Sequence, residues 1–539
     1  MADETSSAAI LLLLLLLQMV AYSVSAPLST SSRWIIDQNS GNRVKLRCVN
    51  WVSHLQPMLA EGIDKKPVST IAQKIGRTGF NCVRFTWPTF MFTRPDYGTL
   101  TVAQSLDRFN LTSAIIGIGK NNPQFLTMKV IEVHKAVVDE LGKNNLMVVL
   151  DNHVSLPNWC CGPDDSNGFF GDSNFNPDEW IQGLTAVARA YKGSPAVVGM
   201  SLRNELRGKN QNEADWYKYM QQGAEAVHKE NPDFLVIVSG LSFDTNLRFL
   251  KDTPFRANVD NKLVFEAHWY AFGSAADQWV TRANYMCGNA IQNVQNNFLF
   301  LTTGNSPFPL FLSEFGIDQR GSNQADNGYI TCLLATAAEA DIDWALWAFQ
   351  GSYILREGQA NLEEFYGVMD INWARPRNRS FLRRLQILGQ VNQVPKSSKG
   401  TTYLMYHPQS GKCTQLRRGK IALRSCRTGS RWEQHDDGGP IKFAGGGRAR
   451  CLSVAGEGQP ARVSNDCTSN GSKWKFASAS GLHLAGADGG GKFLCLEING
   501  NDSMLVTRKC LCLGDDLGDV PKCDVDPQVQ WFKFVPTNV

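Results

Sequence analysis

Residues 196–205 read AVVGMSLRNE, an apolar run that ends on Glu205. A second run, FPLFLSEFG at residues 308–316, carries Glu314. Continuous apolar segments of this length are typical of strands that are buried on both faces of a parallel sheet. Parallel barrels place their functional groups at the carboxyl ends of the strands. Two strand-end glutamates that are distant in sequence are therefore predicted to meet at one site.

Around these two runs, the pattern alternates between strands and helices from residue 34 to residue 390. The candidate strands cover residues 44–50, 81–85, 146–151, 196–204, 234–239, 263–268, 308–314 and 343–349. Helical patterns separate them, as at residues 126–142, 180–191, 215–230 and 328–340. These alternations predict an α/β fold in which the strands close into a (β/α)8 TIM barrel. An open doubly wound sheet is the alternative, but no Gly-x-Gly-x-x-Gly turn follows the first strand.

A different pattern begins after a polar linker at residues 393–402. Residues 403–539 hold eight of the 14 cysteines and a repeat, in which GGGRARCLSV (445–454) matches GGGKFLCLEI (489–498). Three units each begin with a cysteine, contain a second and close on a tryptophan: Cys413, Cys426 and Trp432; Cys451, Cys467 and Trp474; Cys495, Cys510 and Trp531. They predict a threefold all-β module whose tryptophans meet at its centre. The extra cysteines, Cys512 and Cys523, are expected to staple the last loop.

The composition is that of a globular protein, and the formal net charge of +4 is small for 539 residues. No basic block or arginine-rich arm is present, so nucleic acid is not an expected partner. Seven consecutive leucines at residues 11–17, followed by small residues up to Ala26, predict a secretory signal peptide at residues 1–26. The acidic start, with Asp3 and Glu4, leaves a retained membrane anchor as the alternative, although the apolar run is short for a span.

A secreted chain is expected to use its cysteines in disulfides. Cys160 and Cys161 are adjacent, and at least one of them is expected to pair across a loop of the cleft. Four N-x-S/T sequons are candidates for glycosylation: Asn110, Asn378, Asn470 and Asn501. After signal removal we expect an extracellular monomer without membrane association.

Polar and aromatic residues that a buried core would not choose lie at the ends of several other predicted strands: Arg84, His153, Asn204, His268, Tyr270 and Trp347. Each one alone has a structural explanation, as an ion-pair partner, a satisfied buried polar group or core packing. Together they lie at the same end of successive strands, which predicts one shared site around the two glutamates.

Two facing carboxyl groups can hydrolyse a glycosidic bond. One protonates the leaving oxygen, and the other acts as nucleophile or base. The acid must stay protonated near neutral pH, and burial or a like-charged neighbour achieves this by raising its pKa. Either glutamate could play either role. The sequence contains no His-Glu-x-x-His and no paired Cys-x-x-Cys, so no metal and no cofactor are expected.

In order and strand position, these residues resemble the eight-residue active-site pattern of glycoside hydrolase family 5, a cellulase-like family, over residues 34–390. The resemblance implies a retaining β-glycosidase with Glu205 as acid/base and Glu314 as nucleophile. It implies that Asn204 holds the sugar 2-hydroxyl and that Tyr270 and Arg84 position Glu314. By the same resemblance, His153 and His268 line the site, and Trp347 is the stacking floor for the sugar at the cleavage point.

Residues 403–539 resemble ricin-B-type β-trefoil lectin modules. The Gln-x-Trp signature of these modules is replaced by Ser-Arg-Trp and Ser-Lys-Trp in two units, and the last unit reads VQW at residues 529–531. The aspartate that commonly follows the Cys-Leu pair in sugar-binding members is replaced by Ser453 and Glu497. The resemblance therefore implies the trefoil fold more directly than it implies glycan binding.

Taken together, the sequence predicts a secreted retaining glycoside hydrolase with its (β/α)8 domain at residues 27–392 and a β-trefoil at residues 403–539. The expected substrate is a polysaccharide or oligosaccharide, cleaved by double displacement in the manner of an endo-β-1,4-glucanase. Mannanase or exo-acting diglycosidase specificity stays open, because loops set substrate choice. The alternative from another class is a lectin-like carbohydrate-binding protein with weak or no hydrolysis.

Overall fold

The computed structural model describes residues 27–272, 276–434, 436–445, 447–500 and 503–539. The predicted signal peptide at residues 1–26 and the sequon at Asn501 lie outside the described residues. A short hairpin of β1 (Leu28–Ser31) and β2 (Trp34–Asp37) precedes the first barrel strand. Within the described ranges, no helix has both the length and the apolar character that a bilayer span requires.

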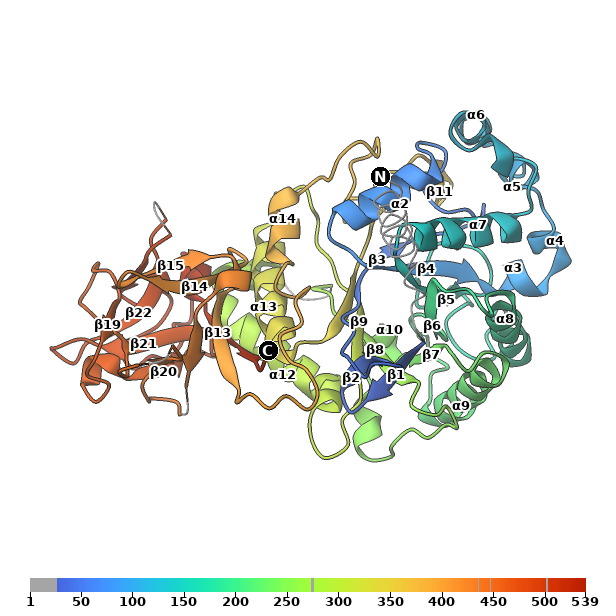
Figure 1. Ribbon diagram of the computed structural model, residues 1–539. Helices are drawn as coiled ribbons and strands as arrows, with labels where there is room; N and C mark the ends of the chain where they lie inside the picture. Colours follow the sequence, from blue (N-terminus) through green and yellow to red (C-terminus); the bar gives the residue numbers. More distant parts are fainter. Residues whose placement is uncertain (1–26, 273–275, 435, 446, 501–502) are drawn as a thin grey trace, which may run out of the picture.

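Eight strands form a closed parallel barrel in the order β10-β3-β4-β5-β6-β7-β8-β9 (Figure 1). Their bounds are β3 Arg47–Trp51, β4 Cys82–Pro88, β5 Met147–Val154, β6 Val197–Ser201, β7 Leu235–Val238, β8 Leu263–His268, β9 Leu310–Glu314 and β10 Asp343–Leu346. Each strand overlaps a predicted one, and nearly every strand residue is buried, as expected where helices cover the outside and side chains fill the inside. The prediction of a (β/α)8 barrel is confirmed.

The helices that follow the strands pack around the barrel (Figure 1). The larger ones are α2 Val68–Arg77, α6 Thr112–Asn121, α7 Val130–Lys143, α8 Pro177–Ala190, α9 Glu213–Glu230, α12 Ala283–Asn297 and α13 Gln324–Ala340. Three of them begin with an asparagine that accepts a backbone N–H: Asn176 for α8, Asn212 for α9 and Asn323 for α13. The predicted helix at 126–142 starts later, at Val130, because Lys129 is extended and pairs with Thr101 in an isolated β-bridge.

Three disulfides lie in the barrel domain. Cys48–Cys82 joins the neighbouring strands β3 and β4, and Cys287–Cys332 joins α12 to α13. Cys160 and Cys161 pair with each other. The prediction that one of them reaches across a loop is therefore wrong, because no other cysteine is left unpaired in the described part of the chain.

Short strands form the C-terminal all-β domain, drawn in orange to red in Figure 1. They are β13 Thr402–His407, β14 Lys412–Arg417, β15 Lys420–Arg424, β16 Arg431–Glu433, β17 Lys442–Phe443, β18 Cys451–Ser453, β19 Arg462–Ser464, β20 Trp474–Ala477, β21 His483–Ala487, β22 Phe493–Ile498, β23 Leu505–Arg508 and β24 Lys533–Thr537. The two cysteines of each repeat unit pair with each other, as Cys413–Cys426, Cys451–Cys467 and Cys495–Cys510. The expected staple, Cys512–Cys523, is confirmed.

The repeat tryptophans do not all meet at the centre of this domain. Trp432 and Trp474 lie in its core, together with Phe532. Trp531 packs instead into the large cluster of the barrel, and its indole N–H donates to Oδ1 of Asn284 on α12 at 3.0 Å. The prediction of a shared tryptophan centre is therefore wrong for the last unit.

The reason is that the barrel covers this face of the C-terminal domain (Figure 1). Leu404, Leu482 and Val535 are buried in the same cluster as the barrel core. At the edge of the contact, Lys533 forms an ion pair with Glu339 of α13 at 2.7 Å. Burial of an apolar face against the barrel is favourable, so the last unit turns its tryptophan outward into this contact.

Candidate active site

The carboxyl ends of the barrel strands surround a cleft of about 800 Å³. Seven of the predicted site residues line it: His153, Asn204, Glu205, His268, Tyr270, Glu314 and Trp347. The eighth, Arg84, is fully buried beneath the cleft and bonds to two of the seven, Asn204 and Glu314. The structure thus brings all eight residues to one place.

The two glutamates share one pocket. Glu314 is the last residue of β9, whereas Glu205 lies beyond the end of β6. Glu205 has a φ of 44°, in the left-handed region that few non-glycine residues adopt. The predicted strand at 196–204 is shorter in the structure and ends at Ser201. A carboxylate oxygen of Glu205, one of Glu314 and a ring nitrogen of His268 all lie within 4.8 Å of one another.

Glu314 accepts two hydrogen bonds from ionic or phenolic donors. Nη1 of Arg84 lies 2.9 Å from its Oε1, and the hydroxyl of Tyr270 lies 3.0 Å from its Oε2. Burial raises the pKa of Glu314 to about 7, while His268 and Arg84 act in the opposite direction. Burial also disfavours the charge on Arg84, but the surrounding carboxylates outweigh it and the pKa of Arg84 is raised. A permanent cation therefore contacts Glu314.

Glu205 has a different environment. Its Oε1 lies 2.9 Å from Nδ1 of His268, and its side chain is 16% exposed. Burial raises the pKa of Glu205 to about 7, while Arg207 and Arg84 limit the rise from a distance. Among the described residues, no arginine or lysine forms an ion pair with its carboxylate. Two carboxyl groups this close titrate as a pair, and the first proton leaves the better stabilised one, Glu314.

Asn204 and His153 form the next part of the wall. Oδ1 of Asn204 accepts from Arg84 at 2.9 Å, and its Nδ2 lies 3.3 Å from Nε2 of His153. Nδ1 of His153 lies 2.6 Å from Asp151, and burial lowers the pKa of His153 well below its usual value. A neutral His153 that donates to Asp151 and accepts from Asn204 satisfies all of these contacts.

Asp244 belongs to the site, although no feature of the sequence indicates it. It ends α10 (Leu241–Asp244), is fully buried, and accepts from the backbone N–H of Glu205 at 3.2 Å. The same oxygen lies 3.5 Å from Nε2 of His268, on the opposite side of the ring from Glu205. Asp244 thus contacts both Glu205 and the histidine that bonds to it. Asp151 and Glu266, which pair with Arg84, did carry a signal, since each is a charged residue inside an apolar strand.

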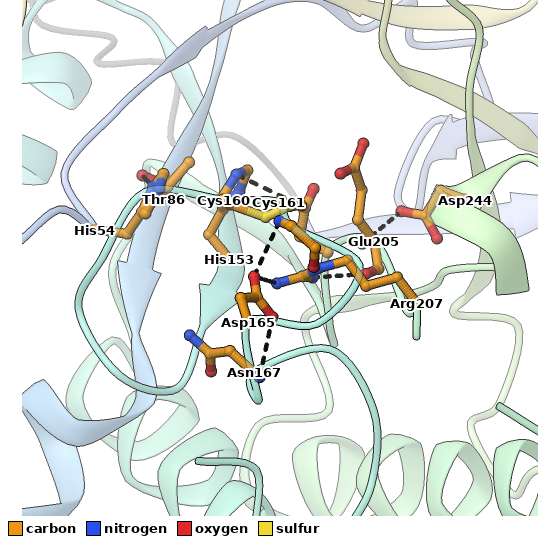
Figure 2. The surroundings of a disulfide bond; sticks show 12 residues. His54, Thr86, His153, Cys160, Cys161, Asp165, Asn167, Glu205, Arg207 and Asp244 are labelled. Atoms are coloured by element: carbon orange, nitrogen blue, oxygen red, sulfur yellow. Dashed lines mark hydrogen bonds and ion pairs between the residues drawn. A yellow bond between two sulfur atoms is a disulfide. The ribbon is translucent and has the colours of Figure 1, made fainter. Parts of the chain in front are cut away.

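The Cys160–Cys161 disulfide also lines the cleft, with both sulfur atoms 3.7 Å from Nδ2 of Asn204. Figure 2 shows how its loop is held. Arg207 donates from Nε to the carbonyl of Gly162 at 3.0 Å and from Nη1 to the carbonyl of Glu205 at 2.8 Å, and it also pairs with Asp165. Arg207 therefore ties the disulfide loop to the backbone of Glu205.

Aromatic side chains form the rest of the cleft surface. Trp347 is 8% exposed and stacks on His153 with ring centroids 5.6 Å apart. Trp159 lines the outer cleft beneath the guanidinium of Arg356, and Phe272, which sequence reasoning did not identify, is 71% exposed and stacks on Tyr270. Two other strand-end tryptophans, Trp87 and Trp269, are buried in the core.

Comparisons with known proteins agree with this geometry. Residues 40–352, more than half of the chain, match the family model described as cellulase (glycosyl hydrolase family 5). The chain belongs to glycoside hydrolase family 5. A protein of Chamaecyparis obtusa described as a glycosyl hydrolase 5 family protein is 44% identical over 97% of this chain and 95% of its own length. The family 5 chain described here is therefore a glycoside hydrolase.

More distant relatives include an endoglucanase of Paenibacillus polymyxa, 22% identical over 48% of this family 5 chain and 64% of that protein. Among solved structures, the endocellulase of Pyrococcus horikoshii has a TM-score of 0.54 at 17% identity, over 68% of this chain and 99% of that one. The catalytic domain of the major endoglucanase of Xanthomonas campestris has a TM-score of 0.51 at 22% identity, over 67% and 99%. These likenesses show the shared fold.

Proposed function

We propose that this glycoside hydrolase cleaves β-1,4-linked glucan within the chain and retains the anomeric configuration. The observation that carries the proposal is the distance between the two acids, whose nearest carboxylate oxygens lie within 4.8 Å. Retaining enzymes hold their carboxyl groups about 5 to 5.5 Å apart, whereas inverting enzymes need about 6.5 to 9.5 Å to admit a water molecule. The short distance favours retention.

In the first step, Glu314 attacks the anomeric carbon while Glu205 gives its proton to the leaving oxygen. The assignment rests on the asymmetry of the contacts, since Arg84 and Tyr270 stabilise a charged Glu314 and neither contacts Glu205. A largely buried acid whose pKa is raised to about 7 keeps a proton to donate near neutral pH.

In the second step, Glu205 takes a proton from water, and the water oxygen attacks the anomeric carbon and releases Glu314. Formation of the glycosyl ester removes the negative charge of Glu314, which lies close to Glu205. Loss of a like charge lowers the pKa of Glu205. The same residue therefore changes from an acid to a base between the two steps.

The surrounding residues bind and orient the sugar in this proposal. Arg84 occupies Oδ1 of Asn204 and His153 takes one of its amide N–H groups, so the second N–H is the one that serves a sugar hydroxyl. Trp347 offers a flat apolar face beside the two acids, and sugar rings stack on such faces through their C–H groups. His153 lies behind Trp347 and fixes its plane by stacking.

The choice of β-1,4-glucan follows the distant relatives, which are described as an endoglucanase and an endocellulase. The experiment is product analysis on glucan, mannan, xyloglucan and flavonoid glycosides, with the anomer of the first product followed by NMR. We expect a fall in the viscosity of soluble glucan and a β-configured product. A first product in the α-configuration would disprove retention, and preferred cleavage of mannan or of a diglycoside would disprove the substrate.

Secretion forms part of the same proposal. The described part of the chain contains no free cysteine and seven disulfides, which are typical of proteins that fold in an oxidising compartment. Expression with the native N-terminus in a eukaryotic secretory host should release a protein that begins near Pro27. Retention of the chain in the membrane fraction would favour the uncleaved anchor instead.

Glycan binding by the C-terminal domain has less support. Glu497, at the position of the usual sugar-binding aspartate, accepts from Gln530 at 2.8 Å and lies 3.3 Å from Arg508. Its carboxylate is thus already bound within the domain. We propose a structural role for Glu497, and a glycan array with full-length Glu314→Gln protein tests it. Specific binding that Glu497→Gln abolishes would favour the lectin-like alternative.

A further inference from the structure

A second hollow, of about 700 Å³, lies at the opposite end of the barrel from the cleft. It includes Arg47 at the start of β3, Phe80 just before β4, and Trp344 near the start of β10. Its far side is formed by Ser425 and Arg427 of the C-terminal domain. The hollow therefore lies where the amino ends of the barrel strands meet the second domain.

Six cationic side chains line this basic hollow: Arg47, Lys74, Arg77, Arg379, Arg383 and Arg427. No aspartate or glutamate lines it. The chain as a whole has 54 lysines and arginines and 50 aspartates and glutamates, so an even mixture would be expected. In the described part of the chain, none of the six belongs to an ion pair with a carboxylate. Their charges are not neutralised by the protein itself.

The cations are close enough to repel one another. Burial lowers the pKa of Arg47, and the charge of Arg427 lowers it further. Nε of Arg47 is buried and has no hydrogen-bond partner, while its Nη1 has only the carbonyl of Gly389 at 3.3 Å. Lys74 donates to the carbonyl of Ala374, and burial with the charges of Lys66 and Arg77 lowers its pKa, although Asp370 acts in the opposite direction. Such clustering destabilises the folded state unless an anion neutralises it.

We propose that the basic hollow binds an acidic polysaccharide, a segment of polyuronate with one carboxylate on each sugar. The cations come from β3, α2, the region of α14 (Arg379–Arg384) and the C-terminal domain, so they approach the hollow from several sides. Six positive charges exceed the charge of a single phosphate and match a row of carboxylates better. Five of the six are arginines, whose guanidinium groups bind carboxylates through two parallel hydrogen bonds.

An extracellular setting favours a polyuronate over nucleic acid, because seven disulfides indicate an oxidising compartment. Bound through this end, the enzyme would be held on an acidic matrix while its cleft, at the other end of the barrel, stays accessible. The inference does not rest on the proposed glucanase activity, because none of the residues that line the hollow also lines the cleft.

The test is isothermal titration calorimetry of the full chain with de-esterified oligogalacturonate, with its fully methyl-esterified form as the neutral probe. The variant combines Arg77→Glu, Arg379→Glu and Arg427→Glu, all at exposed positions of the hollow. The matched control combines Arg108→Glu, Lys120→Glu and Lys420→Glu, which change the net charge equally at exposed positions elsewhere. Hydrolysis of cello-oligosaccharides and the melting temperature are measured on every protein.

We expect binding of the acid form and not of the ester, a loss of at least ~10-fold in affinity in the variant, and little change in the control, since the variant removes three charge-assisted contacts. Hydrolysis of cello-oligosaccharides should be unchanged in both. If the triple Glu variant does not fold, the Gln versions of the same three positions should show the same loss. Absence of binding, equal binding of the ester, an equal loss in the control, or equally tight binding of an oligonucleotide would overturn the proposal.

Discussion

Nη1 of Arg84 lies 2.9 Å from Oε1 of Glu314 at the floor of the cleft. Arg84 lies on β4, and two further buried acids hold it in place, Asp151 at 3.0 Å and Glu266 at 3.5 Å. Burial alone would disfavour the charge on both glutamates. Because a nearby cation stabilises a carboxylate, the contact with Arg84 makes Glu314 easier to ionise than Glu205. Glu314 is thereby favoured as the charged member of the pair.

Replacing Glu314 with Gln should abolish turnover, because an amide cannot form the glycosyl ester. The measurement is kcat on soluble β-1,4-glucan, with circular dichroism to show that the variant folds. Glu457→Gln is the matched control, since Glu457 lies in an exposed ion pair of the C-terminal domain and exposed pairs contribute little to stability. A folded Glu314→Gln protein with full activity would end the assignment of the nucleophile.

Replacing Glu205 with Ala should slow the hydrolysis of a substrate more strongly when its leaving group is poorer. General acid catalysis contributes about 10² to 10⁴ in rate, and an activated aryl glycoside needs little of it. We therefore expect a large loss of kcat/KM on glucan and a much smaller loss in the first step with an activated aryl cellobioside. Equal losses on both substrates would contradict the acid role of Glu205.

Replacing Tyr270 with Phe should move the acidic limb of the pH–rate profile upward. Glu314 must be deprotonated to attack, and the Tyr270 hydroxyl stabilises its carboxylate at 3.0 Å, so removing that bond raises the pKa of Glu314 above about 7. A hydrogen bond to a charged group contributes about 1.5 kcal/mol, which corresponds to a shift of about one pH unit. Tyr285→Phe, on the exposed surface of α12, should leave the profile unchanged, and a downward shift in Tyr270→Phe would refute this contact.

Replacing Asp244 with Ala should reduce both activity and stability, whereas Asn at the same position should restore most of each. Ala leaves the buried N–H of Glu205 without its acceptor, and an unsatisfied buried group costs about 1–3 kcal/mol. Asn keeps that acceptor, because its oxygen can take the position of the oxygen that accepts from Glu205 and lies 3.5 Å from Nε2 of His268. The measurements are kcat and the free energy of unfolding, and equal defects in Ala and Asn would show that the charge of Asp244, not its geometry, matters.

Replacing Glu205 with Gln should stabilise the protein above pH 7 at the expense of activity. Because burial raises the folded-state pKa of Glu205 from 4.5 to about 7, its contribution to stability is fully present below pH 4.5 and is lost as the pH rises through 7. The amide does not titrate, so its advantage should grow over this range, by at most about 3 kcal/mol. Urea unfolding at pH 5 and pH 8 measures it, and an advantage that shrinks with rising pH would contradict the burial of Glu205.

The barrel and the two glutamates could be predicted because their signals are local. A strand buried on both faces must be apolar along its length, so Glu205 and Glu314 at the ends of such runs are conspicuous. Asp151 and Glu266 are equally conspicuous as charges in apolar strands, but only their contacts in the structure show that they pair with Arg84. Asp244 has no local signal, because a single aspartate outside the apolar strands is ordinary, and only the fold brings it into contact with Glu205.

The C-terminal repeat shows where prediction from pattern fails. Equivalent positions of a repeat have similar sequences, so Trp531 was expected to behave like Trp432 and Trp474. The barrel makes the units inequivalent by covering one of them, and Trp531 bonds to Asn284 of α12 instead. In the same way, the pairing of Cys160 with Cys161 depends on which other cysteines the fold leaves within reach.

By itself, the amino-acid order determined the strands, the helices, the repeat and the residues able to do acid–base chemistry, because burial and periodicity act over a few neighbouring residues. Only the tertiary structure decided which charges touch, since Coulomb and hydrogen-bond energies depend on distances of a few ångströms between distant segments. It placed Arg84 in contact with Glu314 and His268 in contact with Glu205. It also gathered unpaired cations at the far end of the barrel, where Arg47, Lys74 and Arg427 come from distant segments and join arginines of residues 375–384.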